Sequence, residues 1–200
     1  MSFRIENKYI LQRNKFQEFY KFLTKNSFTT LYPKRNIHSV YFDNSKLSSY
    51  NESIEGLVPR KKIRIRNYPK PKEKNTSENF LFEIKINSVE GKYKISKNTI
   101  NTGKYLREGY FDNNYGLCFP NVEVLYQRDY FSKADVRITL DSEIQYKFYQ
   151  SKLGYSEKNM VVEIKSNNLN YNNIEEIYGL QKTRFSKYCE AIEHVGLSNN

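Results

Sequence analysis

One short stretch of the chain, Arg60-Lys61-Lys62-Ile63-Arg64-Ile65-Arg66, concentrates basic side chains at a spacing that could bind phosphate. If this stretch is a β-strand, its side chains alternate between two faces, so one face carries cations and the other carries the isoleucines. The β-branched isoleucines favour a strand. Arginine can meet two phosphate oxygens at once and lysine adds a point charge, so such a face could bind a polyanion. The alternative is an amphipathic strand whose basic side lies in water.

Further segments also place charged residues on one face and aliphatic residues on the other. The segments are Arg4–Ile10, Phe80–Ile86, Val136–Asp141 and Met160–Lys165. Their charged faces carry Arg4, Glu6 and Lys8, then Glu83 and Lys85, then Arg137, Thr139 and Asp141, then Glu163 and Lys165. In a closed sheet, either the charges face outward around an aliphatic filling, or they line a hydrated bore while the aliphatic side chains pack under outer helices. Helical stretches at both ends and in the middle of the chain favour the second arrangement, and a basic bore would bind a polyanion.

The overall charge indicates an acidic partner. The chain has 200 residues, a formal net charge of +11 and a pI of about 9.4. That balance suits nucleic acid, anionic lipid or phosphate-rich small molecules. The sequence has no glycine-rich phosphate loop, so side chains must bind any phosphate. Because the basic residues fall on predicted interior faces, we do not expect nucleic-acid binding.

Other residues exclude several classes of site. Cys118 and Cys189 lack metal-ligand spacing, and two scattered thiols fit a reducing cytosol better than a disulfide. His38 and His194 are far apart, and the sequence offers no Ser/His/Asp or Cys/His arrangement. It has neither a signal region nor a run of about 18 apolar residues, so we expect a cytoplasmic protein with no membrane span. The length suits one domain with a substantial core, and we assign residues 1–200 to a single domain.

Periodicity and cap residues predict the elements that position these faces. Helices are expected over Lys15–Lys25, from Asn44 or Ser45 to Ser53, from Ser96 as N-cap to Leu106, from Asn172 or Asn173 to Tyr178, and over Ser186–Val195. Further strands are expected over Ser2–Leu11, Ile37–Asp43, Lys92–Ile95, Val122–Phe131 and Ile144–Phe148. The strand over Val122–Phe131 would place Tyr126 and Arg128 on one face.

Three carboxylates, Glu6, Glu83 and Glu163, fall on the charged faces. They could balance the neighbouring lysines and arginines. Alternatively, one or more of them could hold a divalent cation that bridges phosphate oxygens, because Mg²⁺ prefers hard oxygen ligands. Both interpretations fit the pattern.

Taken in order, these segments resemble the signature of the VTC domain, the catalytic domain of vacuolar transporter chaperone polyphosphate polymerases in the triphosphate tunnel superfamily. The pieces are Glu6-x-Lys8, Val40-Tyr-Phe-Asp43, Arg60-x-Lys-x-Arg64-x-Arg66, Glu83-x-Lys85, Tyr126-x-Arg128, Arg137-x-Thr-x-Asp141, Val162-Glu-x-Lys165 and Arg184-Phe-Ser-Lys187-Tyr. The resemblance covers nearly the whole chain. It implies an α+β fold, a closed antiparallel β-barrel tunnel of about eight strands with helices packed outside. It also implies binding of ATP or another nucleoside triphosphate and of inorganic polyphosphate, with Mn²⁺ or Mg²⁺ as cofactor.

The resemblance assigns roles motif by motif. The side chains implied at the reacting phosphates are Lys8, Arg64, Arg66, Lys85, Arg128, Arg137 and Lys187. Those implied in substrate binding are Glu6, Lys62, Glu83, Tyr126, Lys165, Arg184 and Ser186, together with Lys92 or Lys94, between which the spacing does not decide. Glu163 resembles the family's metal-ligating glutamate, and Arg184 would guard the tunnel mouth.

Two departures refine the expected function. The eukaryotic polymerase also carries a phosphate-sensing domain and membrane helices, which this sequence lacks, so we expect a stand-alone form without coupled translocation. Tunnel hydrolases of the superfamily begin with ExExK, whereas this chain reads Arg4-x-Glu6-x-Lys8. The arginine removes a possible metal ligand, which favours phosphoryl transfer over two-metal hydrolysis. We therefore predict a polyphosphate polymerase-type phosphotransferase. The alternatives are an inorganic triphosphatase or nucleotide hydrolase, and a non-catalytic module that binds polyphosphate or nucleotide.

Overall fold

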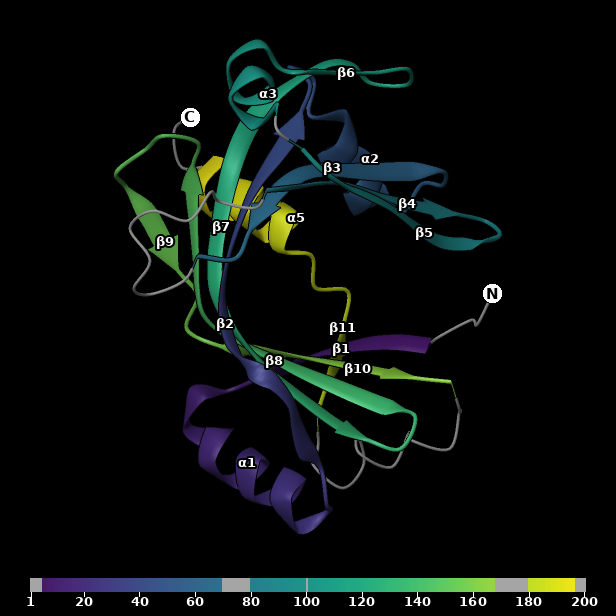
Figure 1. The fold of residues 1–200 in the computed structure, drawn as a ribbon. Helices are drawn as coiled ribbons and strands as arrows, with labels where there is room; N and C mark the ends of the chain where they lie inside the picture. The colour runs from purple at the N-terminus through teal and green to yellow at the C-terminus, as the bar shows by residue number, and fades with distance from the viewer. Residues whose placement is uncertain (1–4, 70–79, 100, 168–179, 197–200) are drawn as a thin grey trace. The chain divides into compact units, whose positions relative to one another are not determined.

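Long antiparallel strands dominate the part of the chain that the computed structural model describes, residues 5–69, 80–99, 101–167 and 180–196 (Figure 1). The strands are β1 (Ile5–Leu11), β2 (Thr29–Asp43), β3 (Arg60–Asn67), β4 (Leu81–Ser88), β5 (Gly91–Asn98), β6 (Tyr110–Asp112), β7 (Gly116–Lys133), β8 (Val136–Phe148), β9 (Gly154–Ser156), β10 (Met160–Ser166) and β11 (Lys182–Thr183). The helices are α1 (Phe16–Lys25), α2 (Ser48–Glu55), α3 (Thr102–Glu108) and α5 (Lys187–Ala191), with a 3-10 turn η1 (Arg13–Lys15) and a π-helical turn η3 (Ile192–Gly196).

The strands are hydrogen-bonded in the order β11-β1-β10-β8-β7-β2-β3-β4-β5, with β6 on β7 and β9 on β8. The pairs β1–β10, β10–β8, β2–β3, β3–β4 and β4–β5 are all antiparallel. This order confirms the α+β class with a mostly antiparallel sheet. Within the described residues the order has two ends, at β11 and β5, so closure into a tunnel stays a prediction.

The chain divides into two compact units. Unit 1 contains Met1–Arg35, Tyr126–Ile144 and Ser156–Phe185, and unit 2 contains Asn36–Leu125, Gln145–Tyr155 and Ser186–Asn200. The long strands β2, β7 and β8 contribute residues to both units. The assignment of residues 1–200 to a single domain stays a prediction.

In unit 1, α1 covers the aliphatic face of the strands (Figure 1). Phe19 and Leu23, one helical turn apart, are both buried. They share a core with Tyr9, Leu11, Val136, Ile138, Leu140, Met160, Val162 and Ile164. Because the charged residues alternate with these along each strand, they occupy the opposite face from α1. For this unit, the prediction that the aliphatic side chains pack under a helix is confirmed.

In unit 2, α3 has the same role. The aliphatic face of its strands forms a core that contains Val40, Phe42, Ile63, Ile65, Phe82 and Ile84. The ring centroid of Phe82 lies 5.1 Å from that of Tyr105 in α3 and 4.7 Å from that of Tyr110 in β6. Arg64 and Arg66 of β3 and Glu83 of β4, which alternate with these core residues, therefore lie on the face that α3 does not cover.

The last helix begins where the sequence predicts. The Ser186 hydroxyl caps α5 by accepting the backbone N–H of Cys189. Tyr188, Ile192 and Val195 are buried, as their spacing indicated. Both cysteines are free and buried.

The helix predicted to start at Ser96 is wrong at its start. Ser96 lies within β5, directly opposite Glu83 of β4, and α3 begins at Thr102 with Asn101 as its N-cap. Serine favours an N-cap through a local hydrogen bond. Here the pairing of β5 with β4 along its whole length outweighs that local preference.

The start of β2 also differs from the prediction. β2 begins at Thr29 rather than Ile37, and it contains Pro33. Because β3 pairs only with His38–Phe42, the missing N–H of the proline costs no bond to β3.

The two strands predicted around residues 136–141 and 144–148 form one strand, β8. The chain passes Glu143 with a left-handed φ of 50°, which lets the strand continue through an irregular position. The helix predicted from Asn172 or Asn173, and Arg4, lie outside the described residues.

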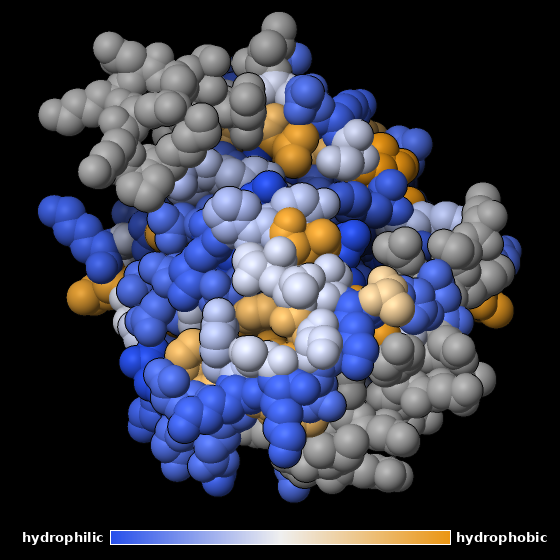
Figure 2. Space-filling model, turned by 60° about the horizontal axis from the view of Figure 1, so that its bottom comes forward, coloured by the Kyte–Doolittle hydropathy of each residue, from blue (hydrophilic) through white to orange (hydrophobic). Residues whose placement is uncertain are grey.

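Hydrophobic side chains occur in small separate groups among polar residues on the face shown in Figure 2. Scattered exposure of this kind is ordinary for a protein surface. None of the helices in the described ranges is long and apolar enough to span a bilayer.

Candidate functional site

The basic strand β3 belongs to a charged face in unit 2. Lys62 pairs directly with Lys85 of β4, and Lys85 pairs with Lys94 of β5, so three lysines stand in one row across neighbouring strands. The adjacent row contains Arg64 opposite Glu83. Like charges directly opposite one another in a sheet are unfavourable. The row of lysines is therefore a place where a bound anion would stabilise the protein.

Glu83 is the carboxylate at the centre of this face. Its Oε2 accepts from Arg64 Nε at 2.7 Å and lies 3.9 Å from Arg66 Nη1, while its Oε1 accepts from Lys94 Nζ at 2.9 Å. Burial opposes ionisation of Glu83, but Arg64, Arg66 and Lys94 outweigh it and hold the pKa at about 2. The carboxylate is thus ionised at neutral pH and balances part of the surrounding positive charge.

Residues of β2 orient the two arginines of β3, both only 7% exposed. Arg64 Nη1 donates to the Tyr41 hydroxyl at 3.1 Å, and Arg66 Nε donates to the Ser39 hydroxyl at 3.1 Å. Ser39 and Tyr41 were not predicted to have a role. Their alternation within Ile37–Asp43 is the sequence signal that could have placed them on the face of the arginines.

Tyr41 also connects this face to the last helix. Its ring stacks on Tyr188 of α5 with centroids 5.3 Å apart, and Tyr188 donates to Asp43 Oδ2 at 2.5 Å. Asp43 in turn accepts backbone N–H groups of Ser49 and Tyr50 in α2. Burial raises the pKa of Tyr41, but the guanidinium groups of β3 and the Lys187 ammonium outweigh burial and lower it.

Lys62 and the start of α5 meet on the same face. Lys62 Nζ donates to the Ser186 hydroxyl at 2.7 Å, and burial lowers the pKa of Lys62. Unit 2 therefore brings together eight of the predicted site residues: Lys62, Arg64, Arg66, Glu83, Lys85, Lys94, Ser186 and Lys187. Lys92 shares the parity of Lys94 and pairs with Asn87 of β4. Of the two, Lys94 is the one that contacts Glu83.

Unit 1 carries a second charged face, on β1, β10 and β8. Lys8 lies opposite Glu163, and Glu6 lies opposite Lys165, which lies opposite Arg137. Lys165 Nζ lies 2.8 Å from Glu163 Oε1 and 3.5 Å from Glu6 Oε2, and Lys8 Nζ lies 3.9 Å from Glu6 Oε1. All of these residues were predicted to share one face, and the register confirms that placement.

Opposing effects set the ionisation of Glu163. Burial raises its pKa, but Arg128, Lys8 and Lys165 outweigh burial and hold the pKa of Glu163 well below its usual range. In return, Glu163 and Glu6 raise the pKa of Lys165 against the effect of burial. Glu163 therefore stays a carboxylate and can act as an anionic ligand.

Two residues of unit 1, Asp141 and Tyr126, hold Arg128 of β7. Its Nε and Nη2 donate to the two carboxylate oxygens of Asp141 at 2.5 and 2.7 Å. Its guanidinium lies 5.3 Å from the centre of the Tyr126 ring, two residues back on the same strand. This bidentate pair fixes the plane of the guanidinium.

Lys8 and Arg184 also belong to unit 1. The Lys8 ammonium donates to the Phe185 carbonyl at 3.1 Å. Arg184 is exposed after β11. Its role as a guard of a tunnel mouth stays a prediction.

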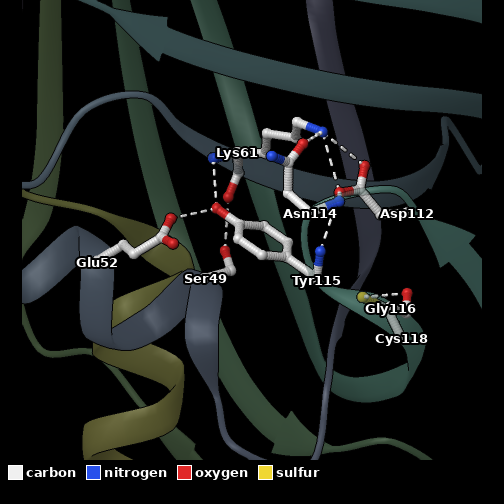
Figure 3. A network of polar contacts seen from close by, with 8 residues as sticks. All are labelled: Ser49, Glu52, Lys61, Asp112, Asn114, Tyr115, Gly116 and Cys118. Atoms are coloured by element: carbon white, nitrogen blue, oxygen red, sulfur yellow. Dashed lines mark hydrogen bonds and ion pairs between the residues drawn. The ribbon is translucent and has the colours of Figure 1, made fainter.

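A polar network on the aliphatic side of β3 holds the start of the basic strand (Figure 3). Lys61 Nζ donates to both carboxylate oxygens of Asp112 at 2.9 Å and to Asn114 Oδ1 at 2.6 Å. The Ser49 hydroxyl donates to the Lys61 carbonyl at 2.6 Å. These bonds connect β3 to α2 and to the turn between β6 and β7, and so they hold the residue next to Lys62.

Removing the hydroxyl of Tyr115 tests this network. The hydroxyl accepts the Lys61 N–H at 2.8 Å and donates to Glu52 (Figure 3). We expect Tyr115→Phe to lower the free energy of unfolding by about 1–3 kcal/mol, because two partly buried groups lose their partner. Urea denaturation measures this change. Tyr20→Phe, at a residue that is 43% exposed, is the control and should change stability little.

Another buried carboxylate of unit 2, Glu123, lies on the other side of the sheet from the arginines. It lies 2.8 Å from His38 Nε2 and 3.2 Å from Lys147 Nζ, and it accepts the Gln150 N–H at 3.0 Å. Burial raises its pKa, but His38, the Gln150 N–H and Lys147 outweigh burial and hold it at about 2. His38 thus has a structural partner.

Stability should fall in acid because of these carboxylates. The pKa of Glu123 is about 2 in the folded protein and about 4.3 in an unfolded chain. Its contribution is therefore complete above the unfolded value and is lost as the pH falls through the folded value. Urea denaturation at neutral pH and at about pH 3 measures the loss. Glu123→Gln should show a smaller decrease over this interval, and an equal decrease would contradict the assignment.

Comparisons with known proteins extend these observations. A family model described as the VTC domain matches residues 3–115 and 109–195. A protein from Pyrococcus horikoshii OT3 has a similar structure, with a TM-score of 0.57 at 14% identity over 96% of this chain and 99% of that chain. A conserved hypothetical protein from Pyrococcus furiosus gives a TM-score of 0.57 at 14% identity over 95% and 100% of the two chains. A candidate adenylate cyclase from Vibrio parahaemolyticus gives 0.53 at 13% identity over 96% and 98%. At these identities the likeness shows the fold alone, and the comparison with curated proteins gave no match.

Proposed function

Because the chain belongs to the VTC domain family, we propose that it is a phosphotransferase that moves the γ-phosphoryl group of ATP to phosphate or to a polyphosphate end. The sheet would close into the tunnel that the family resemblance implies, with the charged faces toward the substrate. The nucleotide substrate is in keeping with a cytoplasmic location.

The row of three lysines across β3, β4 and β5 carries this proposal. Lys62, Lys85 and Lys94 stand directly opposite one another beside two buried arginines, and Glu83 already pairs with Arg64 and Lys94. A triphosphate would bring negative charge to a row where like charges oppose one another. If this face were fully exposed, water could solvate its positive charges without a bound anion. Arg64 and Arg66 are buried, however, so water reaches them little.

The same residues suit phosphoryl transfer. An oxygen of the acceptor phosphate attacks the γ-phosphorus, the bond to the β,γ-bridging oxygen breaks, and that oxygen leaves with ADP. Fixed guanidinium and ammonium groups would neutralise charge on the transferring group and position both reactants. The side chains proposed for this role are Lys8, Arg64, Arg66, Lys85, Arg128, Arg137 and Lys187.

A divalent cation fits the charged face of unit 1. Glu163 is an ionised carboxylate, and the hydroxyl of Thr139, directly opposite it on β8, is buried without a hydrogen-bond partner among the described residues. Both are hard oxygen donors of the kind that Mg²⁺ and Mn²⁺ prefer. We propose that Glu163, with Thr139 beside it, holds the ion, which would offset charge on the substrate's phosphates.

The direct test incubates pure protein with ATP and Mn²⁺ and looks for long polyphosphate on a gel. We expect chain growth, and we expect Arg66→Ala to abolish it. Lys15→Ala is the control, because the pair of Lys15 with Glu18 is exposed and its loss should leave the product unchanged. Phosphate release without chain growth would indicate the hydrolase instead. Binding of triphosphate without turnover would indicate a sensor, and either result would contradict the phosphotransferase.

A further inference from the structure

Two tyrosines and an arginine form a cluster in unit 1 that is separate from the phosphate-binding residues, with Tyr32 and Arg35 exposed and Tyr130 half-buried. The rings of Tyr32 on β2 and Tyr130 on β7 lie 5.5 Å apart, nearly perpendicular at 87°. The Arg35 guanidinium lies 5.1 Å from the Tyr32 centroid and 5.5 Å from the Tyr130 centroid. Tyr32 is 41% exposed and Arg35 is exposed, so the cluster is not part of the hydrophobic core.

The cluster lies next to the charged face of unit 1. Phe131 is buried in the core beneath α1, so its neighbour Tyr130 points to the opposite face of β7. Arg128, two residues before Tyr130, points to that same face, where it pairs with Asp141. Two residues of a strand cover roughly 7 Å. That spacing is comparable to the reach of a ribose between a nucleobase and its first phosphate.

The chemistry of the cluster differs from that of the phosphate-binding residues. Lysines and paired arginines bind anions, whereas tyrosine rings and a guanidinium plane offer flat faces on which a base can stack. Stacking accepts any base but favours the larger rings of purines. The cationic guanidinium also suits a ligand that carries phosphates.

We propose that Tyr32, Arg35 and Tyr130 bind the base of a nucleoside triphosphate whose phosphates contact the charged face of unit 1. This inference rests on the proposed function and specifies its substrate as a purine nucleotide. Inorganic triphosphate would bind to the cationic residues alone, and the cluster would add affinity only for a ligand that carries a base.

Calorimetric titration with ATP and with inorganic tripolyphosphate tests the proposal. Tyr32→Ala and Tyr130→Ala should each weaken ATP binding about tenfold, as loss of one stacking partner does. The ratio of ATP affinity to tripolyphosphate affinity should fall by the same factor. Tyr32→Phe and Tyr130→Phe should keep the ratio, because phenylalanine offers the same ring face. Tyr93→Ala, at a residue of β5 that is 40% exposed, is the matched control.

The outcomes separate this inference from the proposed function. If tripolyphosphate binds and the alanine variants leave the affinity ratio unchanged, the base-binding cluster is refuted and the phosphate-binding face stands. If neither ligand binds the wild type, both are refuted. A short single-stranded RNA that binds more tightly than ATP, with the same loss in the variants, would overturn the nucleotide assignment in favour of nucleic acid.

Discussion

Replacing Glu83 by glutamine should lower the free energy of unfolding by about 3–5 kcal/mol, as removal of one partner from a buried ion pair does. The Glu83 side chain is 2% exposed and pairs with Arg64 and Lys94. Glutamine keeps the shape but removes the charge, so the cations of β3, β4 and β5 lose the carboxylate between them. Urea denaturation measures the change. Glu18→Gln, at an exposed pair with Lys15, is the control and should shift stability by less than about 1 kcal/mol.

Tripolyphosphate should restore much of the stability that this variant loses. The anion would supply negative charge to the same face, and a ligand that binds only the folded state raises the free energy of unfolding. We therefore expect a larger increase in melting temperature on adding tripolyphosphate to Glu83→Gln than to the wild type. An equal increase in both proteins would show that the anion binds away from this face.

Replacing Arg128 by lysine should lower turnover about 100- to 1000-fold, a loss typical of removing one preorganised donor from an active site. Lysine keeps the charge, but it cannot reproduce the bidentate pair with Asp141 or the stacking on Tyr126. Initial rates of polyphosphate formation at saturating ATP measure the loss.

The control for this variant is Arg13→Lys. Arg13 pairs with Glu143 at 2.7 Å, but both side chains are more than half exposed, at 56% and 54%. We expect no change in rate there, because exposed pairs contribute little. A rate for Arg128→Lys equal to that of Arg13→Lys would remove Arg128 from the site, whatever the effect on stability.

Much of the charged faces could be predicted from the sequence, because the side-chain period of a strand is fixed. Alternation alone placed Arg64 and Arg66 on one face and Ile63 and Ile65 on the other, and the cores formed by the isoleucines confirm that division. To predict the row of Lys62, Lys85 and Lys94, one must know the register of three strands. Register depends on pairing between distant segments and cannot be read from one segment.

The wrong and the missing predictions also depend on contacts between segments that are distant in the sequence. Ser96 has the local chemistry of an N-cap, but tertiary pairing with β4 places it in β5. The role of Tyr41 was missed because its partner Tyr188 lies in the last helix, and no local pattern connects the two. The sequence left open whether Glu6, Glu83 and Glu163 balance cations or bind metal, and the structure shows each of them near a lysine.

A crystal structure of the protein with a non-hydrolysable triphosphate analogue and Mn²⁺ tests the central claim most directly. We predict phosphate oxygens within hydrogen-bond distance of the cations on the charged faces, including Arg64, Arg66 and Lys85, with Mn²⁺ on Glu163. Phosphates bound only to outer surface lysines, with no anion against either charged face, would contradict the account.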